Sequence, residues 1–175
     1  AALFAANWPR FLGPAGNAYV SNGVALEAWD VATGAGILWR ASVTNAGFNS
    51  PVVWSNRVFL SGGDASQREV FCYSTADGAL VWRRPVANIP GSPAQSPEVA
   101  EGTGLAASSM ATDGRRAFAI FGNGDLAAFR FDGTLAWAKH LGVPKNAYGH
   151  ATSLVPWEGC LLVQVDQGQA EQNRS

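Results

Sequence analysis

Apolar and polar residues alternate along most of the chain in short runs, without the longer period of a helix. The runs at 57–60, 70–73 and 117–121 are rich in β-branched and aromatic residues and lie between turn-forming residues, which is typical of strands. No long stretch has the period of about 3.6 residues that an amphipathic helix requires. The pattern therefore predicts an all-β fold.

One turn occurs twice with the same surroundings. Asp77-Gly78 precedes Trp82, and Asp132-Gly133 precedes Trp137. Asp-Gly favours a tight hairpin because both residues accept the positive φ that such turns need. Each copy predicts a third strand (69–74 and 126–131) joined to a fourth strand (80–84 and 135–140).

A second repeat begins at Ser50, Ser109 and Ser153. Each serine precedes a short apolar strand, a polar turn and a second apolar strand, and the serines are 59 and 44 residues apart. The longer first interval fits an insertion at 88–104, which is rich in proline, glycine and serine and is expected to be a long loop. Together the two repeats predict four-stranded antiparallel meanders of about 45 residues, the size of a β-propeller blade.

The chain is expected to be one partial β-propeller domain, residues 1–175, with roughly two and a half blades and one N-terminal outer strand. The expected parts are an extension (1–35), a lone outer strand (36–43), a blade (48–87), a loop insertion (88–106), a second blade (107–142) and an incomplete blade (149–175). Propellers close with about four to eight blades. We therefore expect the N-terminal part of a longer protein, completed by its missing C-terminal blades or by self-association.

Charge and hydropathy exclude several classes of protein. The net charge is −1, and the 12 basic and 13 acidic residues are spread evenly, which argues against a nucleic-acid surface. No apolar run approaches the about 18 residues of a membrane-spanning helix. The small residues at 1–6 are typical of the stub left by signal-peptide cleavage, so we expect a periplasmic or extracellular protein.

The repeats resemble those of the quinoprotein-like, or PQQ-binding-like, β-propeller family. Its signature is a strand, a Thr-Gly or Asp-Gly turn, and a tryptophan four residues after the glycine. The spacings 78–82 and 133–137 match it, and the spacing 34–39 is one residue longer. Residues 7–17 resemble the opening of secreted bacterial members.

The resemblance implies a structural role for Trp39, Trp82 and Trp137. In such propellers the recurrent tryptophan packs between neighbouring blades. An indole fills the gap between two flat sheets, and its N–H can reach a backbone carbonyl.

The family's dehydrogenases bind pyrroloquinoline quinone and calcium with a vicinal disulfide, a tryptophan floor and a catalytic aspartate. Cys72 and Cys160 are not adjacent; each is interpreted as a small apolar residue, and a disulfide between them stays open. The carboxylates expected to lie unpaired in turns or the insertion are Asp64, Glu69, Glu98 and Glu101. We predict no catalytic residue, no cofactor and no metal ligand; the alternative is a fragment of a quinone-dependent oxidoreductase.

The candidate ligand site is the segment 145–153, which precedes an innermost strand and should lie at one mouth of the central channel. Tyr148 and His150 offer stacking, hydrogen bonding and titration near neutral pH. Asn49 and Ser108 occupy the matching positions of the other blades. His150 as a hydrogen-bonded strand-start residue is the alternative, and His140 is expected to be solvated.

These observations predict a non-catalytic binding or scaffold module of an exported propeller protein. Its loops, including the insertion at 88–104, would face a protein or glycan partner.

Overall fold

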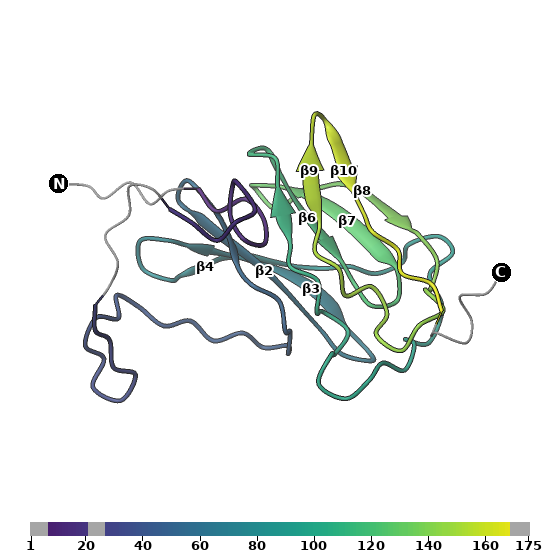
Figure 1. The fold of residues 1–175 in the computed structure, drawn as a ribbon, viewed down its shortest axis with the longest axis horizontal. Helices are drawn as coiled ribbons and strands as arrows, with labels where there is room; N and C mark the ends of the chain where they lie inside the picture. The colour runs from purple at the N-terminus through teal and green to yellow at the C-terminus, as the bar shows by residue number, and fades with distance from the viewer. Residues whose placement is uncertain (1–6, 21–26, 169–175) are drawn as a thin grey trace.

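The computed structural model describes residues 7–20 and 27–168 (Figure 1). It confirms the all-β prediction: the described residues form ten strands in three antiparallel sheets and no helix. Within this part of the chain, nothing has the length and apolar character of a membrane-crossing helix.

Each sheet is one repeat unit, with its strands in sequence order. The first unit contains β1 (Val52–Trp54), β2 (Arg57–Gly63), β3 (Arg68–Ser74) and β4 (Leu80–Pro85). The second contains β5 (Ala111–Thr112), β6 (Arg116–Ile120), β7 (Asp125–Arg130) and β8 (Leu135–His140). The third has β9 (Val155–Trp157) and β10 (Cys160–Leu162).

The two complete units share one register. Phe59 of β2 lies opposite Cys72 of β3, and Phe118 of β6 lies opposite Ala128 of β7. In each unit the pairing between the third and fourth strands shifts just after this position. The core is formed by these middle strands, whose side chains are almost entirely buried.

The repeated serines join neighbouring units. The Ser50 N–H donates to Ser109 Oγ (2.9 Å), and the Ser109 N–H donates to Ser153 Oγ (3.3 Å). The first strands of the units contact one another in the same order, β1 with β5 and β5 with β9. The serine spacing in the sequence therefore corresponds to side-by-side inner strands.

Tryptophans form a second set of contacts, at the outer strands. Trp82 of β4 lies against the glycine of the β7–β8 turn, where a Cβ on Gly133 would be 3.0 Å from the indole Cγ. The Trp82 Nε1–H donates to Phe131 O (2.8 Å). Trp39 lies in the same way against Gly78, and its Nε1–H donates to Thr75 O (2.8 Å). Each indole thus reaches from one outer position to the hairpin turn of the following unit.

Trp137 of β8 lies differently. It is only half-buried and contacts Phe118 of its own unit, with ring centroids 6.0 Å apart. Among the described residues, no glycine turn of a following unit covers it.

The outer strand expected at 36–43 is not a strand in the structure. Residues 37–43 pair with no strand of the described chain. Side-chain bonds hold the segment in place, from Trp39 to Thr75 and from the Tyr73 hydroxyl to Ser42 O (2.9 Å). A fourth strand needs the third strand of its own unit as a partner, and none of the described strands pairs with this segment.

The N-terminal segment borders the inner strands. Trp8 pairs with Val53 of β1 through two backbone hydrogen bonds of 2.8 and 2.9 Å. The Thr112 N–H of β5 donates to Pro9 O (2.8 Å). Residues 8–9 therefore connect the inner edges of the first and second units.

Replacing Gly133 by alanine tests the contact between Trp82 and the following unit. Gly133 and Gly142 both have positive φ (+85° and +93°), but a Cβ at Gly142 would have no atom within 4 Å. Backbone strain is therefore similar in the two alanine variants, and only Gly133→Ala pushes on the indole. We expect Gly133→Ala to lower the free energy of unfolding by about 1–3 kcal/mol more than Gly142→Ala, measured in urea. Equal losses would show that the glycine is required for its φ alone.

Candidate functional site

Tyr148 is the exposed centre of the predicted channel mouth. Its side chain is 57% exposed and borders a pocket of about 460 Å³. The pocket is lined by Asn146, Ala147, Tyr148, Gly149, Ala151, Asp166 and Gly168. The Tyr148 N–H donates to Asn146 Oδ1 (2.7 Å), and Asn146 Nδ2 donates to Asp166 O (2.6 Å). These bonds fix the loop that carries the phenol ring.

The other three predicted site residues are engaged in bonds to the backbone. His150 is buried, with Nε2 3.2 Å from Gly142 O, so this nitrogen carries the proton. The Ser108 hydroxyl donates to His150 O (2.7 Å). Asn49 Nδ2 lies 2.7 and 2.9 Å from two backbone carbonyl oxygens. Ser108 therefore contacts His150 directly. A ligand role for His150, Ser108 and Asn49 stays a prediction.

The burial of His150 gives a pH dependence of stability. Burial lowers the pKa of the imidazole below its usual value of 6.5, although the Gly142 carbonyl opposes this shift. The unfolded chain therefore binds a proton more readily than the folded chain. The stabilisation is fully present above the unfolded pKa and is lost as the pH falls through the folded pKa.

We expect the wild-type chain to lose stability below about pH 6.5 and His150→Gln to lose less over the same window. The measurement is urea unfolding of both chains at several pH values between neutral and mildly acidic. Parallel curves for the two chains would contradict a buried neutral His150.

Sequence reasoning missed a buried polar cluster around Asp125, the first residue of β7. The Asp125 side chain is 0% exposed and accepts hydrogen bonds from Ser92 Oγ and Asn123 Nδ2, each at 2.8 Å. His140 Nδ1 lies 2.9 Å from Oδ1 and carries the proton, because an ionised carboxylate only accepts. Arg68 Nε lies 3.2 Å from Oδ2.

This cluster joins three separate parts of the chain. Arg68 belongs to the first unit, Asp125 and His140 to the second, and Ser92 to the loop insertion. The prediction that His140 is solvated was wrong: its side chain is 13% exposed. The one signal in the sequence was a carboxylate directly before the apolar residues 126–129.

The expectation that Glu69 lies unpaired in a turn or the insertion was also wrong. Glu69 is buried in β3 and forms an ion pair with Arg83 of β4, with Arg83 Nε 2.5 Å from Oε1. The Asn45 side-chain amide donates to the other oxygen of the same carboxylate. Glu69 therefore fixes the 37–48 segment against the first unit rather than lying unpaired in a turn.

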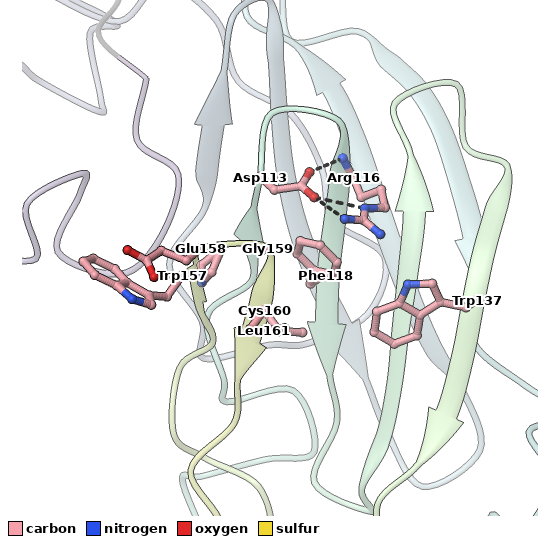
Figure 2. Close-up of a pocket in the computed structure, with 10 residues that line it drawn as sticks. Asp113, Arg116, Phe118, Trp137, Trp157, Glu158, Gly159, Cys160 and Leu161 are labelled. Carbon is pink, nitrogen blue, oxygen red and sulfur yellow. Dashed lines mark hydrogen bonds and ion pairs between the residues drawn. The ribbon is translucent and has the colours of Figure 1, made fainter.

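A second pocket, of about 340 Å³, lies between the second unit and the β9–β10 hairpin (Figure 2). Figure 2 shows Phe118 and Trp137 on one side and Trp157 on the other, with the Asp113–Arg116 ion pair (2.7 Å) nearby. Its other lining residues are Pro156, Glu158, Gly159, Cys160 and Leu161.

The two cysteines of the chain do not form the vicinal disulfide of the dehydrogenase type. Cys72 and Cys160 are both free, one buried in β3 and the other exposed in β10, so the disulfide between them is excluded. Burial raises the pKa of the Cys72 thiol to about 12. Within 7–20 and 27–168, no three histidine, cysteine, aspartate or glutamate side chains cluster as ligands of a metal ion.

One comparison, with protein-family profiles, agrees with the architecture. A family profile described as outer membrane protein assembly factor BamB matches residues 7–156. No curated protein matches the chain. Among solved structures, the crystal structure of BamB from Moraxella catarrhalis is similar at 16% identity and a TM-score of 0.47, over 72% of this chain and 34% of that one. The chain thus spans about a third of the length of that protein.

The repeat signature, the four-stranded units and the family match describe one architecture. The match extends over most of the sequence. The chain belongs to the BamB-like family of PQQ-repeat β-propeller proteins, and its described residues form part of a propeller.

Proposed function

We propose that this chain is a non-catalytic binding scaffold of an exported β-propeller protein, and that the surface around Tyr148 contacts a protein partner. The family profile is that of an assembly factor for outer membrane proteins, which supports a partner that is a protein and a location outside the cytoplasm. A glycan partner has no comparable support.

The exposed phenol ring of Tyr148 carries the proposal. It is 57% exposed beside the pocket of about 460 Å³, while the hydrogen bonds of Asn146 hold its loop in place. Tyrosine is enriched in protein interfaces because its ring offers a large apolar area and its hydroxyl a polar end. A fixed loop also loses little conformational entropy on binding.

The arrangement around Asp125 supports a scaffold rather than a hydrolase. A catalytic triad places the imidazole between the nucleophile and the carboxylate. Here the carboxylate lies between the two: Ser92 donates to one oxygen of Asp125, and His140 contacts the other. His140 therefore does not activate Ser92. We propose that the chain acts without a catalytic residue, a cofactor or a metal ion.

Photo-cross-linking at Tyr148 tests the partner surface. Tyr148 is replaced by benzoylphenylalanine and the chain is irradiated with an envelope extract of the cells that encode it. The matched control carries the same replacement at Tyr19, which is 66% exposed but far from the pocket in sequence. We expect one discrete protein adduct at position 148 and none at position 19. Equal labelling of both positions, or no adduct at 148, would overturn the proposed surface.

A further inference from the structure

The first half of the loop insertion is anchored between the first and second units. The Ser92 hydroxyl donates to Asp125 Oδ2 of β7 (2.8 Å). The Ser96 hydroxyl accepts a hydrogen bond from Arg68 Nη1 of β3 (3.3 Å). Arg68 and Asp125 also lie beside each other, with Nε 3.2 Å from Oδ2. One largely buried charge pair therefore holds both serines of the insertion.

The second half of the insertion contains a tight turn at residues 100–103. The Thr103 N–H donates to Ala100 O (3.1 Å). Gly102 is third in the turn and has a φ of +82°, a value that favours glycine at this position. Glu101, second in the turn, is exposed. The turn thus presents a carboxylate to solvent on a fixed backbone.

Two exposed aromatic residues border this turn. The Ala100 N–H donates to Ala147 O (2.7 Å), which directly precedes Tyr148. A Cβ at Gly104 would lie 3.0 Å from the ring of Phe48, which is 65% exposed. Residues 100 and 104 are at most about 14 Å apart along the backbone. An interface of about 800 Å² on each partner is wide enough to span both ends of this short stretch.

The insertion adds negative charge beside these rings. Residues 88–104 carry two carboxylates, Glu98 and Glu101, both exposed, and no lysine or arginine. Asp166 in the Tyr148 pocket is also exposed. The segment 145–153 contributes one lysine, Lys145. The surface therefore combines apolar rings with an excess of negative charge, which complements basic and apolar side chains on a partner.

We propose that the turn at 100–103 is the centre of the partner-binding surface, with Tyr148 and Phe48 at its sides, and that this surface takes a protein segment with basic and apolar side chains. The inference rests on the proposed function, which assigned Tyr148 alone. Ser92 and Ser96 hold the turn in place through the buried charge pair. The two rings supply apolar contact area, and Glu101 selects the charge of the partner.

Hydrogen exchange tests, without any partner, whether the turn supports the Tyr148 loop. Ala100→Pro removes the N–H that bonds to Ala147 O. We expect amide exchange in residues 145–150 to become about fivefold faster, with circular dichroism unchanged. The control is Ala94→Pro in the same insertion, because Ala94 is exposed and its N–H donates to no other residue of the described chain. Equal exchange in Ala100→Pro and the wild type would overturn this support.

A second variant acts from the buried end of the insertion. Ser92→Ala together with Ser96→Ala removes both anchoring hydroxyls and leaves the backbone unchanged. We expect faster exchange in residues 145–150 as well as in 88–104. Ser66→Ala is the control, since this hydroxyl bonds to the exposed Asp64 and its loss should alter neither segment. Faster exchange confined to 88–104 would overturn the role of the anchor at Tyr148.

Photo-cross-linking maps the surface itself. Benzoylphenylalanine at position 101 or 48, irradiated with the same envelope extract, should give an adduct with the same protein as position 148, identified by its tryptic peptides. Position 19 again serves as the exposed control. An adduct at 148 without adducts at 101 and 48 would overturn the extended surface and leave the Tyr148 contact standing. Unlabelled positions 148, 101 and 48 would overturn the proposed function, whatever the exchange rates.

Charge reversal tests the chemistry of the partner. In a chain with benzoylphenylalanine at position 148, Glu101→Lys should lower the adduct yield by about threefold or more. Added salt should also lower the yield of the unreversed chain, because it screens exposed charges. Glu27→Lys makes the same change in net charge at an exposed position of another segment and should leave the yield unchanged. An equal or higher yield with Glu101→Lys would overturn a basic partner.

Discussion

Replacing Trp82 by alanine is expected to lower the free energy of unfolding by about 3–5 kcal/mol. The indole is 6% exposed and packs against Phe59 and Phe129, with ring centroids 6.0 and 5.9 Å away. Its Nε1–H donates to Phe131 O of the second unit. The substitution therefore removes packing in the first unit and a contact between units. Urea unfolding at low protein concentration measures the loss.

Tyr19→Ala is the control, because this ring is 66% exposed and its loss should change stability by no more than about 0.5 kcal/mol. Trp137 occupies the position in the second unit that matches Trp82. Trp137 is half-buried, so Trp137→Ala should cost clearly less than Trp82→Ala. A Trp82→Ala chain with an unchanged urea midpoint would contradict the packing between the units.

Replacing Asp125 by alanine is expected to cost a similar amount, about 3–5 kcal/mol, because it removes one partner of a buried charge pair. Arg68 would keep its charge with only 14% of its side chain exposed. His140, Asn123 and Ser92 would each lose an acceptor. The free energy of unfolding in urea measures this loss.

The control for this change is Glu98→Ala in the exposed part of the loop insertion, expected to be nearly neutral. Because Ser92 fixes the same insertion to Asp125, Asp125→Ala should also make residues 88–104 more sensitive to limited proteolysis. A stable variant with an unchanged cleavage pattern would show that the cluster does not hold the loop.

The parts of the fold that repeat could be predicted from the sequence. The Asp-Gly turns and the tryptophans recur because each unit packs one flat sheet against the next in the same way. The serine spacing carried the same information, since Ser50, Ser109 and Ser153 contact one another in turn. Contacts that repeat from unit to unit can therefore be predicted from the sequence alone.

Contacts that occur once were not predictable. The contacts of Asp125 with Arg68, Ser92 and His140 bring together three segments that are distant in sequence. No local sequence pattern predicts such contacts. The strand expected at 36–43 failed for a related reason, because a strand exists only when a neighbour pairs with it. The sequence contained the turn at 30–35, but no described strand pairs with residues 37–43. Among the candidate site residues, Tyr148 is exposed, while His150, Ser108 and Asn49 bond to the backbone. Their role in binding a ligand stays a prediction.

A titration with pyrroloquinoline quinone and calcium tests most directly whether this propeller binds a protein or oxidises a substrate. Quinone absorbance is followed with the purified chain at rising quinone concentration, and dye reduction with alcohols and sugars is recorded in the same samples. A quinone-dependent dehydrogenase serves as the positive control. We predict no saturable change in absorbance and no dye reduction. Saturable, calcium-dependent quinone binding with substrate-dependent dye reduction would contradict the scaffold account.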